Sequence, residues 1–246
     1  MTQSMTLFVL PFAGGNLYSY RKFQSHMPPD ILMHPLEYPG RGRRQHETPL
    51  HSGEELARDI CRQMHGHTDL PFSLYGHSLG ALVGFLVCRE LHRSGMPDPM
   101  HLFVSGSNGP SLKRKKEARY KLERQAFFEL VGRIGGTPEA VLTEVDLMCY
   151  LEPMLRADIR AYDTYVYSAD TPLNSPITVF AGEEDPATTI EGCGAWRNET
   201  SGIVDVYTCP GNHFFIFDHG ETLCRIMTQK LYQYAPMAMA PMHQAG

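Results

Sequence analysis

Short apolar runs recur along the chain and alternate with longer segments of helical periodicity. Each run is bounded by glycine, proline or polar residues and is too short to form a helix. Uninterrupted apolar runs of this kind are typical of strands buried on both faces of a parallel sheet. We therefore expect strands at residues 7–10, 31–33, 72–75, 101–104, 177–180 and 203–207.

Two of the intervening segments carry clear helix signals. The segment 52–64 begins Ser-Gly-Glu-Glu, which places a helix-capping serine before two acids in the first turn. The segment 79–93 has apolar residues at helical spacing. Alternating strands and helices predict an α/β fold with a mostly parallel central sheet and helices on both faces.

One long region breaks this alternation. Residues from about 111 to 168 contain no convincing strand. The stretch 113–134 is predicted to be one amphipathic helix, Gly-Gly-Thr-Pro at 135–138 breaks it, and further helix follows to about residue 167. We expect one domain over residues 1–246, with a helical lid inserted at about 111–168 and a disordered tail at about 236–246.

Composition excludes several classes of function. The 246 residues are 42% hydrophobic and 20% charged, as in ordinary globular proteins, and the net charge of −5 argues against a basic nucleic-acid surface. No apolar run reaches membrane-spanning length, and the N-terminus lacks a secretory signal, so we expect a cytoplasmic protein. The six cysteines include no C-x-x-C pair, so they predict neither a zinc site nor a redox site.

The most informative motif is Gly-His-Ser-Leu-Gly at residues 76–80. The pattern G-x-S-x-G is weak by itself, but here a strand is predicted just before it and a helix just after it. A sharp strand-to-helix turn exposes the serine hydroxyl above the sheet, over the N-terminus of the helix. Ser78 is therefore our candidate nucleophile.

A serine hydroxyl reacts only when a base takes its proton and a third group orients that base. The loop after the predicted strand 177–180 offers Asp185, and the loop after the strand 203–207 offers His213. The chain order serine, aspartate, histidine is the order that this kind of fold uses. We predict that Ser78, Asp185 and His213 form the catalytic set.

Each choice has competitors nearby in the sequence. Glu183 and Glu184 precede Asp185, and we expect both to be solvated loop acids. His219 falls where the last helix is predicted to begin, so a capping or surface role is expected for it. His77 adjoins the nucleophile, and an adjacent residue cannot easily fold back onto its neighbour's hydroxyl. We expect His77 to pack rather than to act as the base.

Acyl transfer also requires two backbone N–H groups that point at the developing oxyanion. Leu79, directly after the nucleophile, supplies the first of them. The loop after the first strand, Pro-Phe-Ala-Gly-Gly at residues 11–15, is rich in glycine and occupies the usual place of the second donor. We predict an oxyanion hole formed by Ala13 and Leu79.

With these residues in place, the sequence resembles the type II thioesterases of polyketide and nonribosomal peptide synthesis, which are α/β-hydrolases. The resemblance covers about residues 6 to 232 and rests on several motifs together. These are LPFAGGN, YPGRGRR with the following Glu47 and Pro49, YGHSLGAL, LFVSG, LRADIRAYDTY, AGEEDP and PGNHFF. Leu79 stands where methionine is frequent in the family, a volume-conserving difference.

The resemblance implies an enzyme that hydrolyses acyl groups from phosphopantetheine-bearing acyl- or peptidyl-carrier proteins and thereby edits mis-primed or stalled assembly lines. An acyl-CoA or fatty acyl-carrier thioesterase, or a carboxylesterase with the same triad, is the alternative. A non-catalytic acyl-binding module is a further one, against which the complete set of catalytic residues argues. No cofactor, nucleic acid or membrane is implied.

Two features of the expected lid extend this interpretation. The segment 113–124 carries seven basic residues against two acids in an otherwise acidic chain. It is either a solvated face or a surface that steers acidic carrier proteins. A second stripe recurs at helical spacing and either packs the lid or lines an acyl chamber. It consists of Met148, Leu151, Met154, Leu155 and Ile159.

Overall fold

Six strands form one sheet in the computed structural model, which describes residues 5–68, 70–113 and 117–238. All neighbouring strands are parallel, in the order β2-β1-β3-β4-β5-β6. Every strand expected from an apolar run is present, with ends that shift by one or two residues, so the predicted α/β fold is confirmed. The strands are β1 (Met5–Leu10), β2 (Ile31–Pro35), β3 (Phe72–His77), β4 (Leu102–Ser105), β5 (Ile177–Gly182) and β6 (Val204–Cys209).

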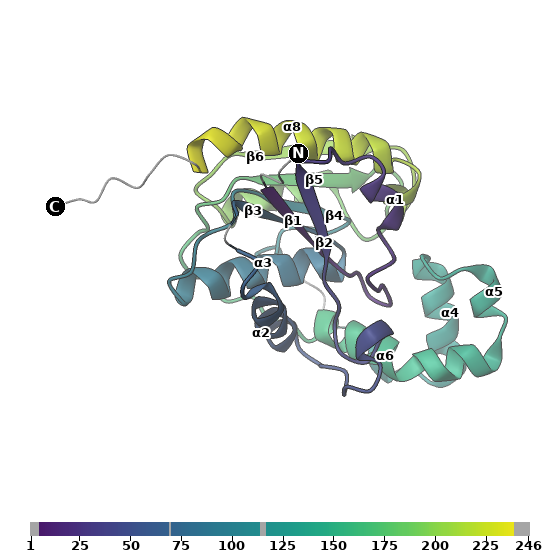
Figure 1. Ribbon diagram of the computed structural model, residues 1–246. Helices are drawn as coiled ribbons and strands as arrows, with labels where there is room; N and C mark the ends of the chain where they lie inside the picture. Colours follow the sequence, from purple (N-terminus) through teal and green to yellow (C-terminus); the bar gives the residue numbers. More distant parts are fainter. Residues whose placement is uncertain (1–4, 69, 114–116, 239–246) are drawn as a thin grey trace.

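Helices cover both faces of this sheet (Figure 1). On one face, α1 and α8 bury residues such as Phe23 and Leu223 against the strands. On the other face, α2 and α3 bury residues such as Ile60 and Leu82. The helices are α1 (Arg21–Gln24), α2 (Gly53–Met64), α3 (Leu79–Arg93), α4 (Arg124–Ile134), α5 (Glu139–Leu142), α6 (Val145–Asp163), α7 (Ile190–Gly194) and α8 (Gly220–Ala238).

The two helices predicted most clearly from the sequence have the predicted ends. The Ser52 hydroxyl accepts a hydrogen bond from the Glu55 amide at 3.1 Å, so it caps α2 as expected. Helix α3 is buried along almost its whole length. A helix that is apolar on all sides belongs in the interior, and α3 lies under the centre of the sheet with α2 on its outer side.

The region between β4 and β5 holds α4, α5 and α6, which project beside the sheet (Figure 1). Their apolar side chains form a separate small core, in which Phe127 and Val131 of α4 meet Met148 and Leu155 of α6. The apolar stripe predicted on this helix therefore packs mainly inside the inserted unit. The C-terminal end of α6 joins the main core through Ala161.

The single helix predicted for residues 113–134 is wrong. The segment contains a short 3₁₀ turn at Arg119–Lys121 and then α4 from Arg124, while residues 114–116 lie outside the described residues. The backbone amide and guanidinium of Arg119 both bind the carboxylate of Asp163, at 2.8 Å and 2.6 Å. This contact with α6 takes the place of helical hydrogen bonds at Arg119. Repulsion between the neighbouring basic side chains of the segment also disfavours a helix.

Two basic side chains of this segment are also engaged inside the molecule. Arg119 pairs with Asp163, and Arg124 pairs with Glu152 at 2.8 Å. Lys115 and Lys116, which the steering hypothesis also needs, lie outside the described residues. The described part of the segment 113–124 therefore presents fewer free positive charges than its composition suggests.

At the C-terminus, α8 continues to Ala238, so the first residues of the expected tail are helical. Residues 239–246, the rest of that tail, lie outside the described residues. Among the helices of the described part of the chain, none has the length and apolar character needed to cross a membrane.

Candidate active site

The strand order reverses direction at β1, which lies between β2 and β3. In open parallel sheets, ligands bind outside the carboxyl ends of the strands at such a reversal. The register pairs Leu10, the last residue of β1, with Gly76 near the end of β3. The glycine loop (residues 11–15) and the turn at Ser78 therefore begin side by side at this edge of the sheet.

Ser78 occupies a strained backbone conformation between β3 and α3. Its φ of 55° and ψ of −113° make it the one non-glycine residue of the described part of the chain with positive φ. Its amide donates to the Ser105 carbonyl at 2.8 Å, and α3 begins at the next residue. Backbone strain of this kind persists where the surrounding structure enforces it, typically at functional sites.

The two predicted oxyanion donors lie on neighbouring pieces of backbone. A Cβ atom at Gly80 would be 2.7 Å from the Leu10 carbonyl oxygen, so the first turn of α3 touches the end of β1 where the glycine loop starts. Within the described residues, the amides of Ala13 and Leu79 donate no hydrogen bond to another protein group. Both N–H groups are therefore available to a bound oxygen atom.

Asp185 and His213 meet as the sequence predicts. His213 Nδ1 donates to Asp185 Oδ2 at 2.9 Å, and both side chains are buried. The carboxylate is held further by the Ala187 amide at 2.8 Å and the Thr188 hydroxyl at 3.2 Å. With Nδ1 occupied in this way, the neutral imidazole has its lone pair on Nε2, the atom that a general base uses.

The electrostatics of this pair favour an ionised carboxylate. Burial acts to raise the pKa of Asp185, but the hydrogen bond and charge of His213, followed by the bonds from Ala187 and Thr188, lower the pKa overall. Asp185 therefore remains an anion across the neutral range and stabilises a positive charge on His213.

The His213 ring lies against the elbow. Its centroid is 4.8 Å from the ring of His77, the residue before Ser78. A Cβ atom at Gly106 would be 3.1 Å from His213 Cε1, and Gly106 follows the serine that binds the Ser78 amide. No hydrogen bond joins Ser78 Oγ to another side chain of the described residues, and such contacts often tighten only when substrate is bound.

The competing residues named from the sequence lie in other surroundings. Glu183 and Glu184 are exposed, whereas Asp185 is buried. His219 directly precedes α8, and its carbonyl accepts a hydrogen bond from the Leu223 amide, as expected for a residue at a helix start. None of these three side chains bonds to His213 in the described residues.

A second serine–histidine pair lies beneath the elbow. His77 Nδ1 is 2.9 Å from Ser105 Oγ, which also contacts the Tyr75 hydroxyl at 3.0 Å. All three side chains are fully buried, and His77 Nε2 has no partner among the described residues. Burial, with a smaller effect of His213, lowers the pKa of His77 well below its usual value. This neutral, inaccessible group fits the packing role predicted for His77.

Sequence reasoning missed Arg41 and Asp158, which meet behind the glycine loop. Asp158 is fully buried on α6, between the apolar residues Leu155 and Ile159 of the predicted stripe. A carboxylate on the apolar side of an amphipathic helix is the signal that the sequence contained, because buried charges need partners.

Comparisons with known proteins give one consistent family. The family model "Thioesterase domain" matches residues 5–231. The chain is similar to the gramicidin S biosynthesis protein GrsT of Aneurinibacillus migulanus, with 32% identity over 92% of this chain and 89% of the relative.

Solved structures give the same result. The RedJ thioesterase of the prodiginine pathway in Streptomyces coelicolor has a TM-score of 0.86 and 34% identity over 93% of this chain and 86% of its own. The type II thioesterase BorB of the borrelidin biosynthetic cluster has a TM-score of 0.86 and 29% identity over 94% of this chain and 95% of its own.

The elbow predicts a strict requirement for glycine at position 76. A Cβ atom there would lie 2.1 Å from the Gly80 carbonyl oxygen, which is backbone and cannot move aside. We expect Gly76→Ala to lower the free energy of unfolding by about 3 kcal/mol or more, measured by chemical denaturation. As a control, Gly132→Ala in α4 makes only an ordinary contact at 3.7 Å with Leu142 and should gain about 0.5–1 kcal/mol. Equal effects of the two substitutions would contradict the assigned elbow geometry.

Proposed function

Because the chain belongs to the thioesterase family and to its type II members, we propose that it hydrolyses acyl groups from the phosphopantetheine thiol of carrier proteins. The relatives described above serve the biosynthesis of gramicidin S, prodiginine and borrelidin. Removal of unwanted acyl groups from acyl- or peptidyl-carrier proteins edits mis-primed or stalled assembly lines of that kind.

The hydrogen bond between His213 and Asp185, beside the strained turn at Ser78, carries this proposal. It orients an imidazole whose Nε2 is a general base and leaves an anion behind it to stabilise the imidazolium. A packing histidine needs no such carboxylate, as the neutral and buried His77 illustrates.

In the acylation step, Ser78 Oγ gives its proton to His213 Nε2 and attacks the thioester carbonyl carbon. The resulting oxyanion accepts hydrogen bonds from the Ala13 and Leu79 amides. When the tetrahedral intermediate collapses, the C–S bond breaks and His213 returns the proton to the departing pantetheine sulfur. The acyl group is then an ester of Ser78.

Deacylation repeats the same steps with water as the nucleophile. His213 takes a proton from a water molecule, whose oxygen attacks the ester carbonyl, and the oxyanion again lies between the two amides. Collapse breaks the bond to Ser78 Oγ, which regains its proton from His213. The net reaction converts a thioester and water into a carboxylic acid and a thiol, with no other reactant.

Two serines are close to histidines, and their substitution tests the assignment. We expect Ser78→Ala to lower kcat for an acyl-N-acetylcysteamine thioester by about a million-fold, because the nucleophile is lost. Ser105→Ala is the matched control and should keep most of the activity, since its hydroxyl contacts the buried side chains of His77 and Tyr75. The opposite pattern would assign the reaction to the buried pair.

The orienting acid gives a second test. Asp185→Asn keeps the shape of the side chain but removes the charge and favours the wrong histidine tautomer, so kcat should fall by about 10⁴-fold. The carboxylate is already ionised in the parent at neutral pH, because its pKa lies below the usual value. If Asp185→Asn keeps the parental kcat and the parental pH profile, Asp185 has no part in the mechanism.

The substrate class is tested by intact-mass measurement of a panel of acyl-loaded carrier proteins, with acyl-CoA and a simple carboxylic ester of the same acyl group alongside. We expect the carrier-bound acyl groups to be removed with the highest kcat/KM. A higher kcat/KM for acyl-CoA or for the ester would contradict the editing role and indicate one of the alternative hydrolases. Binding without turnover of any substrate would indicate a non-catalytic module.

A groove beside the site fits the approach of the phosphopantetheine arm. It has a volume of about 510 Å³ and is lined by Tyr18, Ser19, Arg21, Lys22 and Phe217. Phe217 belongs to the turn that follows His213, and its ring is 6.0 Å from that of Phe12 in the glycine loop.

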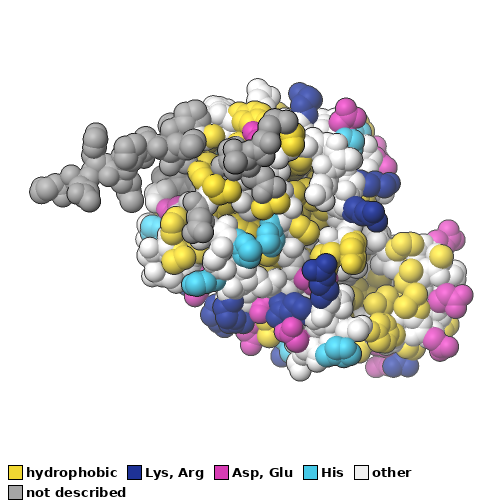
Figure 2. Space-filling model, viewed as in Figure 1, with side chains coloured by type: hydrophobic (Ala, Val, Ile, Leu, Met, Phe, Trp, Pro, Cys, Tyr) yellow, Lys and Arg dark blue, Asp and Glu magenta, His cyan; other side chains and the backbone are white. Residues whose placement is uncertain are grey.

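The charge of this groove suits the proposed partner. The basic residues of the short helix α1 are both exposed, and Figure 2 shows Lys and Arg side chains at the edge of the hollow between the sheet body and the unit of α4–α6. The phosphopantetheine arm carries a phosphodiester, and carrier proteins are generally acidic. We therefore propose that Arg21 and Lys22 bind the phosphodiester and the acidic surface of the carrier protein.

Charge reversal tests this docking site. Arg21→Glu should raise KM for an acyl-carrier protein about five- to tenfold at low salt and leave KM for the acyl-N-acetylcysteamine thioester unchanged. The matched control is Arg58→Glu on α2, an exposed arginine on the other face of the sheet. The difference in KM for the acyl-carrier protein between Arg21→Glu and the parent should shrink as salt is added, because exposed charges are screened. Equal KM values for carrier in the two variants would place docking elsewhere.

A further inference from the structure

A buried ion pair connects the segment after β2 to helix α6. Arg41 binds Asp158 through two hydrogen bonds, of 2.7 Å and 2.6 Å, and the two side chains are only 4% and 1% exposed. Burial acts to lower the pKa of Arg41, but the charge and hydrogen bonds of Asp158 raise it overall, so the guanidinium stays charged.

Both members of this pair also hold the glycine loop. Asp158 Oδ2 accepts a hydrogen bond from the Gly14 amide at 2.8 Å. Arg41 donates to the Gly15 carbonyl at 3.1 Å. One carboxylate and one guanidinium therefore fix the backbone groups at the two ends of the Gly14–Gly15 pair.

These contacts determine where the Ala13 amide points. The Gly15 amide donates to the Phe12 carbonyl at 2.8 Å and closes a tight turn. In a trans peptide the C=O and the next N–H point in opposite directions. The Ala13 N–H shares a peptide with the Phe12 carbonyl, so it is directed away from the turn as long as Gly14 and Gly15 keep their positions.

Helix α6 contacts the same loop directly. A Cβ atom at Gly14 would lie 2.8 Å from Leu155 Cδ2, and Leu155 is three residues before Asp158, on the same face of the helix. Leu155 also belongs to the small core shared with α4. The loop thus rests on the helix that carries the inserted unit.

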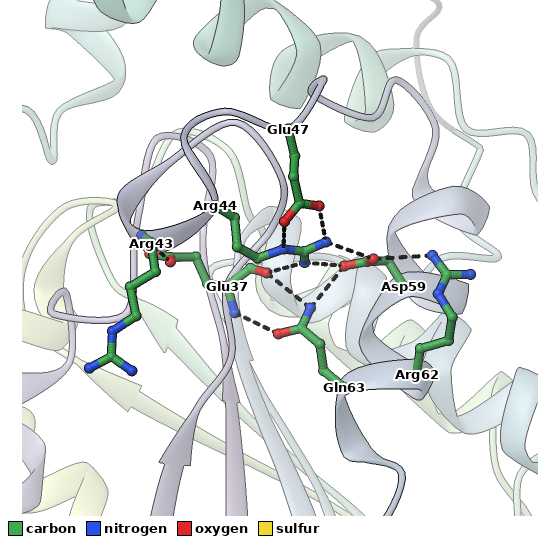
Figure 3. A network of polar contacts seen from close by, with 7 residues as sticks. All are labelled: Glu37, Arg43, Arg44, Glu47, Asp59, Arg62 and Gln63. Carbon is green, nitrogen blue, oxygen red and sulfur yellow. Dashed lines mark hydrogen bonds and ion pairs between the residues drawn. The ribbon is translucent and has the colours of Figure 1, made fainter.

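Arg41 is itself held in place from the opposite side. Figure 3 shows the neighbouring network, in which Arg44 binds Glu47 and Asp59 of α2 at 2.6 Å and 2.5 Å. The Glu37 carboxylate accepts from the Arg43 amide at 2.8 Å, and a Cβ atom at Gly42 would collide with it. The backbone that follows Arg41 is therefore fixed to Glu37, just after β2, and to α2.

We propose that Arg41 and Asp158 are positioning residues that set the second oxyanion donor. Through Gly14 and Gly15 they hold the Ala13 N–H in its catalytic direction, and they make that direction depend on the placement of α6. This inference rests on the proposed function, because it assigns a supporting role in the acyl transfer at Ser78.

A purely structural role is a poor explanation for this pair. Removing two charges from water is expensive, and a well-packed apolar pair of similar size is often as stable or more stable. Apolar side chains cannot, however, bind the Gly14 amide and the Gly15 carbonyl together. A role in folding and a role in positioning the backbone can therefore be distinguished, because an apolar replacement should keep the stability and lose the positioning.

The experiment compares Asp158→Asn with the double variant Arg41→Met and Asp158→Leu. Both should lower kcat for acyl-N-acetylcysteamine about ten- to a hundredfold, with KM changed less than about twofold, because a weakened oxyanion donor affects mainly the transition state. The double variant should keep a Tm equal to or above that of the parent.

Asp163→Asn is the matched control on the same helix, because Asp163 pairs with Arg119 and not with the glycine loop. This variant should keep the parental kcat.

A second readout makes the test independent of the substrate. A fluorophosphonate reacts with an activated serine, whose oxygen displaces fluoride from phosphorus while the phosphoryl oxygen occupies the oxyanion hole. The rate of labelling of Ser78 should fall in both variants in parallel with kcat. Parental labelling in the folded double variant, a loss confined to KM, or an equal loss in Asp163→Asn would overturn the inference.

The same probe separates this inference from the proposed function. If carrier proteins are not substrates, labelling of the parent is unaffected and the role of Arg41 and Asp158 is still measured. If Ser78→Ala labels as fast as the parent, the nucleophile itself is misassigned, and both proposals fail together.

Discussion

The hydrogen-bonded pairing of β1 with β3 is the constraint on which the site depends. Because Leu10 lies opposite Gly76, the loops that leave these two strands start at the same point of the sheet edge. A shift of the register by one residue would turn every side chain of β3 to the other face and separate the two loops. The contact between Gly80 and the Leu10 carbonyl requires the same alignment, since there is no room for a side chain between them.

Two buried aspartates then complete the site from opposite directions, and their partners explain their different roles. Asp185 accepts hydrogen bonds from an imidazole, an amide and a hydroxyl, and in the proposed mechanism this imidazole gains a proton. Asp158 faces a permanently charged guanidinium and a backbone amide, neither of which changes charge. In the proposed mechanism the first carboxylate therefore stabilises a transient charge, whereas the second holds the glycine loop in place.

Local patterns made most of this architecture predictable. Apolar runs marked all six strands because both faces of a parallel sheet are covered, and chain order along the strand ends selected Asp185 and His213. Contacts between distant residues that no motif marks were not predictable. Arg119 leaves the expected helix because Asp163, 44 positions away, binds its backbone. Arg41 and Asp158 are 117 positions apart, and no periodicity in the sequence links them.

The placement of Asp158 has a consequence for how the inserted unit and the site act together. The helix that bears Asp158 packs on α4 through Met154 and Leu155, so one chain of contacts links the inserted unit to the Gly14 amide. A buried ion pair tolerates little displacement, because its attraction compensates for lost hydration only at close range. In the proposed mechanism, contacts between a substrate and the unit of α4–α6 would therefore bear on the Ala13 amide through Asp158 and Gly14.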